Sequence, residues 1–212
     1  AETHEVITDF TKSDQVLKKL EENLGKLGIS QLMMVYLSER KDLERLILSA
    51  VRHSIKHPKQ NILKDFGNDD ILEISKICRS VSRERHRMLA FVRFELLQDE
   101  VYFAKIEPDF NVLPLIRKHF KERYADQKWM IFDLKRHYGI FYDLKEVQFF
   151  TPDSSQLQNF RNSEQFHHEE EKKYQKLWQS YFVKTGIPER KNMKLHIQWV
   201  PKRYWKYLTE KY

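Results

Sequence analysis

The chain has 212 residues, of which 41% are hydrophobic and 13% aromatic, so it can form one large folded domain or two small ones. Its single cysteine, Cys78, excludes an internal disulfide, a cysteine-based zinc site and an iron–sulfur cluster. No apolar run approaches the roughly 18 residues that span a bilayer, and no signal peptide is visible. We therefore expect a cytoplasmic protein with no membrane partner.

Residues 11–87 carry the 3.6-residue periodicity of helices. We expect Gly25 to end a first helix, Ser38 to cap a second, and His57-Pro58 to end that second helix. Asn68 is expected to cap a third helix that reaches Arg87. The residues of this third helix expected to face inward are Ile71, Ile74, Cys78 and Val81.

The pattern changes to strand-like alternation at Met88. Leu89–Leu97 and Val101–Ile106 predict one β-hairpin, and Trp129–Leu134 with Gly139–Leu144 predict a second. Between the hairpins, Pro108–Tyr124 predicts a helix, with Pro114 tolerated in its first turn.

The rest of the chain predicts a polar loop at Thr151–Ser163 and a helix at Glu164–Lys184. The expected buried face of that helix consists of Tyr174, Leu177, Trp178, Tyr181 and Phe182. The order of helices followed by ββαββα favours an α+β fold with a mostly antiparallel sheet. A helical part, 1–87, and a second part, 88–212, are expected to form one cooperative unit, because no Gly/Pro/Ser-rich linker separates them.

Carboxylates at two places are candidates for catalysis. Glu107 and Asp109 follow a predicted strand and precede a helix, where they either hold Mg²⁺ or act as acid and base, or lie at the helix N-terminus as ordinary capping residues. Asp133 and Asp143 flank the second hairpin and are expected to approach each other across it. No histidine pair has metal-ligand spacing, so we expect no zinc and no cofactor.

The tip of the second hairpin combines cations with aromatic residues. Arg136 and Tyr138 lie there, and this combination suits contact with a nucleic-acid backbone or groove. The alternative is a solvated turn in which Gly139 supplies a positive φ.

The C-terminal segment is the most basic part of the chain. Residues 186–212 hold seven basic and two acidic side chains, which is most of the chain's net charge of +7. Cations neutralise phosphates and aromatic faces stack on bases, so the segment favours nucleic acid as a partner. The alternative is that the aromatic residues pack as core while the lysines face solvent. Its candidate binding residues are Arg190, Lys194, Lys202, Arg203, Tyr204 and Trp205.

Several runs also carry a family resemblance. Tyr102–Leu144 and Glu189–Lys211, most specifically PKRYWKYL at Pro201–Leu208, resemble a bacterial family of unknown function. Its members are assigned to DNA metabolism or DNA repair, are encoded beside a radical-SAM protein, and in some cases are fused to a uracil-DNA-glycosylase-like domain. Members usually begin with a short segment that would precede Ala1, and they often have Q-H-M-P at Gln198–Pro201, where this chain reads Q-W-V-P.

Three functions remain open from the sequence. The leading hypothesis is a DNA-binding module that works with a radical-SAM protein or a glycosylase-like domain. The second is a metal-dependent nuclease or lesion-processing enzyme that uses Glu107, Asp109, Asp133 and Asp143. The third is a protein-interaction scaffold whose basic segment docks an acidic partner.

Overall fold

The structure is a computed structural model that describes residues 8–58, 60–185 and 192–211. It divides into two compact units, residues 1–83 and 84–212. Among the described residues, no helix has the length and apolar character needed to cross a bilayer. Whether the two units unfold as one cooperative unit stays a prediction.

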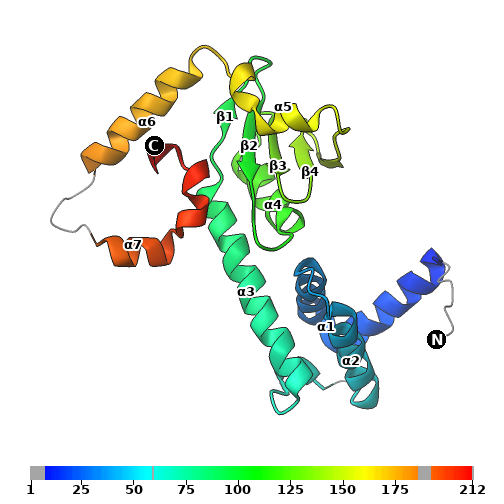
Figure 1. Ribbon diagram of the computed structural model, residues 1–212. Helices are drawn as coiled ribbons and strands as arrows, with labels where there is room; N and C mark the ends of the chain where they lie inside the picture. The colour runs from blue at the N-terminus through cyan, green and yellow to red at the C-terminus, as the bar shows by residue number, and fades with distance from the viewer. Residues whose placement is uncertain (1–7, 59, 186–191, 212) are drawn as a thin grey trace. The chain divides into compact units, whose positions relative to one another are not determined.

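The first unit is entirely helical over its described residues. It contains α1 (Phe10–Leu37), α2 (Leu43–Lys56), a 3₁₀ turn η1 (Ile62–Lys64) and the start of α3 (Asp69–Phe91) (Figure 1). The predicted helical character of residues 11–87 is therefore confirmed. Its core combines residues from all four elements, including the predicted inward face of α3: Leu32, Val35, Leu46, Ala50, Leu63, Ile71, Ile74, Cys78 and Val81.

The helix ends in this unit match the sequence only in part. Asn68 caps α3 as predicted, because its Oδ1 accepts the backbone N–H groups of Asp70 and Ile71 at 3.0 and 3.3 Å. Gly25 has a φ of 70°, but the helix resumes after it, so the residue kinks α1 and does not end it. Ser38 follows the end of α1, and Asp42 occupies the N-cap position of α2, so the predicted role of Ser38 was wrong.

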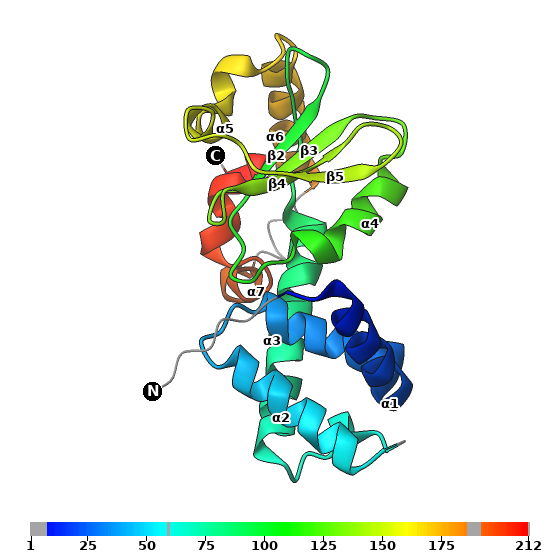
Figure 2. The same ribbon diagram turned by 90° about the vertical axis from the view of Figure 1, so that its right-hand side faces the viewer.

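The second unit is built on a five-stranded sheet with strand order β1-β2-β3-β4-β5 (Figures 1 and 2). β2 and β3 pair in parallel because α4 (Leu113–Arg123) connects them, and the other three pairings are antiparallel. The strands are β1 (Glu95–Leu96), β2 (Tyr102–Ile106), β3 (Trp129–Asp133), β4 (Tyr138–Tyr142) and β5 (Val147–Phe150). The predicted α+β class is confirmed.

The predicted ββαββα order differs from the observed one at two strands. The expected strand Leu89–Leu97 is reduced to β1, because α3 continues to Phe91 with Met88 and Val92 buried one helical turn apart. β5 was not predicted; it pairs antiparallel with β4 and extends the second hairpin to three strands.

Helices cover both faces of the sheet. On one face, Phe120 of α4 lies 6.1 Å from Trp129, measured between ring centroids. On the other face, where α5 (Leu157–Arg161) lies (Figure 2), Phe160 stacks on Phe132 with ring centroids 4.6 Å apart. Residues of β2 and β3 alternate between these faces, so Tyr102 and Trp129 share the α4 face.

The C-terminal part consists of short helices and one long one. The expected helix Glu164–Lys184 begins later in the structure, as α6 (Glu171–Thr185), and its predicted apolar face is exposed, so that expectation was wrong. The other elements are η2 (Ser163–Phe166), α7 (Met193–Trp199), η4 (Lys202–Tyr207) and η5 (Thr209–Lys211).

Gly139 is needed for close packing. The positive φ expected at Gly139 belongs to His137, whose φ is 55°, while Gly139 lies in β4. A Cβ atom at Gly139 would lie 2.5 Å from Cζ of Phe150 and 2.8 Å from the carbonyl oxygen of Ile131. Since one of these contacts is backbone, a side chain cannot be accommodated by a rotamer change alone.

Gly139→Ala is expected to lower the free energy of unfolding by about 1–3 kcal/mol through overpacking, measured by urea denaturation. Gly67→Ala is the matched control: its Cβ would meet only Asp65 Oδ1 at 3.4 Å, and we expect a change within about 1 kcal/mol. Equal stabilities for the two variants would show that β4 and β5 pack more loosely than described.

Candidate nucleic-acid interface

The loop between β2 and α4 holds two of the predicted catalytic carboxylates. Asp109 is ion-paired with Arg203, and Glu107 accepts hydrogen bonds from Lys206 and, at 2.8 Å, from the hydroxyl of Tyr207. The bond from Lys206 lowers the pKa of Glu107, so it is ionised near neutral pH. The N-cap of α4 is Val112, which makes no side-chain cap, so neither carboxylate caps this helix. Both bind the C-terminal segment instead.

Glu84 is the centre of this network, and it was not singled out from the sequence. Its side chain is buried, with a residue exposure of 1%, and its oxygens accept the Tyr204 hydroxyl at 2.6 Å, Arg203 Nη2 at 2.8 Å and the Asp109 backbone N–H at 2.9 Å. Burial, and then the bond to Glu84, raises the pKa of Tyr204 well above its usual range, so the hydroxyl stays a donor. A buried carboxylate with three donors is a structural anchor.

Asp133 and the hairpin tip form a second satisfied cluster. Asp133 is fully buried; it accepts Arg136 Nη1 at 2.8 Å and the backbone N–H groups of Lys135 and Arg136 at 2.9 and 3.1 Å. Burial raises the pKa of Asp133, although the bond to Arg136 acts in the opposite direction. Arg136 also donates to the carbonyls of Pro108 and Asp109, and Tyr138 bonds Asn111. The predicted binding residues Arg136 and Tyr138 therefore hold the hairpin to the β2–α4 loop.

Asp143 lies at the far end of the same hairpin. Asp133 pairs with Tyr138 at the turn, whereas Asp143 follows Tyr142, which pairs with Trp129 four positions away. At about 3.3 Å per residue, the two carboxylates are more than ~10 Å apart, so the expected approach across the hairpin was wrong. Over the described residues, no three His, Cys, Asp or Glu side chains are grouped to hold a metal ion.

The predicted C-terminal binding residues divide into three groups. Lys194 and Lys202 are exposed, while Arg203 is exposed but ion-paired. Tyr204 is 2% exposed and cannot stack on a base; Trp205 is half-buried and donates its indole N–H to the Val200 carbonyl at 2.9 Å. Arg190 lies outside the described residues. Burial lowers the pKa of Arg203, but the hydrogen bond with Tyr204 and the charges of Glu84 and Asp109 raise it by more. The net result is a raised pKa.

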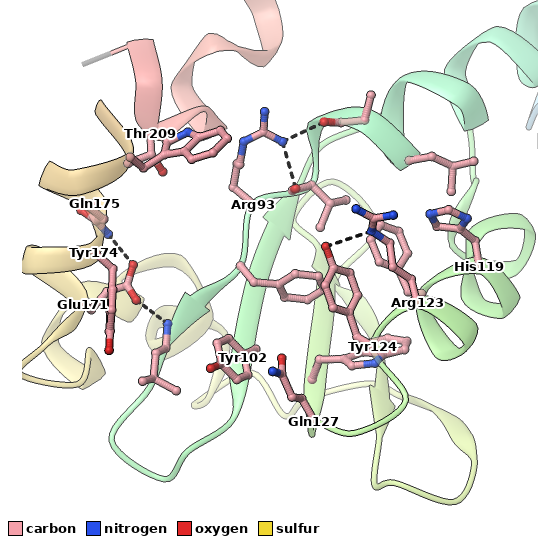
Figure 3. Close-up of a pocket in the computed structure, with 18 of the residues that line it drawn as sticks. Arg93, Tyr102, His119, Arg123, Tyr124, Gln127, Glu171, Tyr174, Gln175 and Thr209 are labelled. Carbon is pink, nitrogen blue, oxygen red and sulfur yellow. Dashed lines mark hydrogen bonds between the residues drawn. The ribbon is translucent and has the colours of Figure 1, made fainter. Parts of the chain in front are cut away.

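The second unit has a cleft of about 900 Å³ that is lined by aromatic, amide and cationic side chains (Figure 3). One wall comes from α6, with Tyr174, Gln175 and Trp178. The opposite wall comes from the end of α4, with His119, Arg123 and Tyr124. Tyr102 of β2, Gln127 and the buried Trp129 contribute between the walls. We call this hollow the aromatic cleft.

Two buried carboxylates fix α6 as a wall of the aromatic cleft. Glu171 accepts the backbone N–H of Leu96 at 2.8 Å and the side-chain amide of Gln175 at 3.0 Å (Figure 3). Glu210, with a side-chain exposure of 6%, accepts Arg93 Nη2 at 2.7 Å and the Trp178 indole N–H at 2.9 Å. Thus α6 is attached at its first turn and at its middle.

The rings on α6 remain accessible in this arrangement. Tyr174 is 49% exposed and Trp178 41% exposed, although both line the aromatic cleft. On the other wall, Tyr124 stacks on Phe120 at 6.1 Å with an interplanar angle of 10°, and Arg123 Nε lies 3.4 Å from its hydroxyl. The cleft therefore presents supported aromatic rings to solvent.

The sequence contained a signal for this cleft, but it was assigned to the core. Aromatic residues at 174, 178, 181 and 182 recur at helical spacing, and such a stripe is usually buried. Four lysines share the helix: Lys172, Lys173, Lys176 and Lys184. An aromatic stripe beside a cluster of lysines, in a basic chain, is also typical of a nucleic-acid surface.

Comparison with known proteins places the chain in a family. A model of DUF4130, a domain of unknown function, matches residues 41–210. The chain belongs to this family. A domain of unknown function agrees with the family of unknown function that the sequence resembles, and the match covers the second half of the first unit and nearly all of the second unit. No curated protein and no solved structure matches the chain.

Glu210→Gln tests the attachment of α6. Burial opposes ionisation, but bonds from Arg93 and Trp178 lower the pKa of Glu210 in the folded state. The stabilisation is therefore present above the unfolded-state pKa and is lost as pH falls through the folded pKa. At neutral pH we expect the variant to lose about 2–3 kcal/mol of unfolding free energy, by urea denaturation.

The difference from the parent should shrink as the pH falls below about 4, where the parent carboxylate is protonated. Glu122→Gln is the control, because Glu122 is 66% exposed and 3.7 Å from Lys118, and should change stability by less than about 0.5 kcal/mol. An equal effect of both variants would show that Glu210 does not hold α6.

Proposed function

We propose that this chain is a DNA-binding module of DNA metabolism that holds unpaired nucleotides in the aromatic cleft. The observation that carries the proposal is the pair of accessible rings, Tyr174 and Trp178, on a wall fixed by Glu171 and Glu210. Stacking on a base requires a ring that is exposed on one face and held in place, and both conditions are met here.

The charge around the cleft supports a polyanionic ligand. Lys172, Lys173 and Lys176 are exposed on the same helix as the stacking rings. The whole chain carries +7. Lysines beside aromatic rings attract the phosphates of a strand whose bases occupy the rings, and this pattern is tolerant of sequence.

Unpaired DNA suits the cleft better than a duplex does. Its rings line a hollow between α6 and α4, which suits a base that has left its stack. Arg136 at the hairpin tip, and Arg203 and Lys206 of the C-terminal segment, are bound to carboxylates of the same unit. The predicted nucleic-acid contacts at Arg136, Tyr138 and Arg203 therefore have less support than the cleft.

The family resemblance extends the proposal to partners. A module that presents an unpaired or damaged nucleotide would act together with a radical-SAM protein or a uracil-DNA-glycosylase-like domain, which would supply the chemistry. The alternative of a metal-dependent nuclease has less support, because each of Glu107, Asp109 and Asp133 is paired with a cation and Asp143 lies at the other end of the hairpin.

Tyr174 offers a direct test, because its hydroxyl makes only a 3.3 Å bond to the exposed Glu170. Tyr174→Ala is expected to weaken binding of a short oligothymidylate by about 1–3 kcal/mol, which is roughly 5- to 150-fold, by loss of one stacking ring. Tyr174→Phe keeps the ring and should bind like the parent. Fluorescence anisotropy at several salt concentrations measures both affinity and salt dependence.

Leu177→Ala is the matched control, because Leu177 is 57% exposed on α6 but does not line the aromatic cleft. It should leave affinity unchanged. The proposal fails if the parent binds no single-stranded DNA at low salt, or if Tyr174→Ala and Leu177→Ala bind equally well.

A further inference from the structure

The two arginines of the aromatic cleft differ in what they contact. Arg93 is engaged on all sides: it forms a two-point ion pair with Glu210, at 2.7 and 3.2 Å, and donates to the carbonyls of Ala90 and Val92 at 2.7 and 3.2 Å. Its guanidinium also lies over the Trp178 ring at 5.9 Å. Arg93 therefore holds the cleft together, and four of its five N–H donors are already used.

Arg123 has open donors. Its contacts are the Tyr124 hydroxyl at 3.4 Å from Nε and the Tyr124 ring at 5.7 Å. It is exposed, and it has no carboxylate partner in the part of the chain that the structure describes. Arg123 lies in the last turn of α4, where a positive charge interacts favourably with the helix dipole. This interaction leaves both terminal nitrogens of the guanidinium available for a ligand.

The aromatic cleft also holds a side-chain amide that is available to a ligand. Gln127 lines the cleft just before β3, beside the point where the Tyr102 N–H bonds the Lys128 carbonyl at 3.0 Å. The amide of Gln175 is already bonded to Glu171, whereas the amide of Gln127 makes no hydrogen bond within the described part of the chain. An amide offers one donor side and one acceptor side, which is what the edge of a nucleobase requires.

We infer that the aromatic cleft binds one whole unpaired nucleotide, with its base on the rings of the cleft, its edge toward Gln127 and its phosphate on Arg123. This assignment rests on the proposed function and goes beyond it by naming the ligand unit and its phosphate partner. A guanidinium binds phosphate oxygens through two parallel hydrogen bonds, and Arg123 is the cleft cation whose geometry permits this.

Three probes separate the parts of this site: thymidine, thymidine 5′-monophosphate and a short oligothymidylate, each titrated by calorimetry. The parent should bind the monophosphate more tightly than the nucleoside by roughly tenfold or more, because a charge-assisted bond is added. Arg123→Gln should abolish this difference and weaken oligonucleotide binding by a similar factor.

Arg117→Gln is the matched control, because Arg117 is exposed on the same helix, lies 5.5 Å over the Phe149 ring and does not line the cleft. It should preserve the preference for the monophosphate. Thermal melting of both variants shows whether each is folded, and both changes are conservative in size and helix propensity.

The outcomes distinguish this inference from the proposed function. If the oligonucleotide binds and Tyr174→Ala weakens it, but Arg123→Gln equals Arg117→Gln, the phosphate assignment is overturned and the proposed function stands. If the monophosphate binds through Arg123 but the oligonucleotide does not bind, the nucleotide site stands and the DNA function falls. If no probe binds the parent, both are overturned.

Discussion

The carboxylate of Glu210 is the interaction on which the second unit's cleft depends. It joins Arg93, which follows α3, to Trp178 in the middle of α6, from a position in η5 near the C-terminus. Three segments distant in sequence meet at this one buried acid. Because the attachment is a polar contact and not a packed apolar face, α6 is held beside the sheet while its rings stay exposed.

A second buried acid, Glu84, acts on the rest of the C-terminal segment. Through Tyr204 and Arg203 it fixes η4, and the same arginine reaches Asp109 in the β2–α4 loop. Removing one partner from such a buried network leaves an uncompensated charge, which is costly. Within this segment, Arg203 and Lys206 thus make internal structural contacts, while Lys194 and Lys202 stay exposed.

Parts of the fold that depend on local pattern could be predicted from the sequence. Asn68 and the buried stripe of α3 follow from capping and helical period, and β3 with β4 follows from alternation around a polar turn. The end of α3 could not be placed, because Leu89 and Phe91 fit a strand pattern while Met88 and Val92 fit a helical one. Only packing in the folded protein decides whether these residues form a strand or continue the helix.

The candidate site depends on contacts between segments that are distant in the sequence. The sequence pattern does not show which segments meet. An amphipathic stripe on α6 shows that one face is apolar, but not whether another element covers it. Likewise, Asp133 and Asp143 flank one hairpin, yet the register puts them at opposite ends. The carboxylates that proved central, Glu84 and Glu210, lie in no motif. They matter because the fold brings Arg203 and Tyr204 of η4 to Glu84, and Arg93 and Trp178 to Glu210.

The most direct test of the account follows the four indole N–H signals of the protein in a two-dimensional NMR titration with oligothymidylate. Trp178 lines the cleft, Trp205 lies in the C-terminal segment, and Trp199 is 69% exposed on α7 away from the cleft-lining residues. The account predicts a saturable shift of the Trp178 signal with Trp199 unchanged. Shifts confined to Trp199 or Trp205, with Trp178 unaffected, would contradict a nucleotide-binding aromatic cleft.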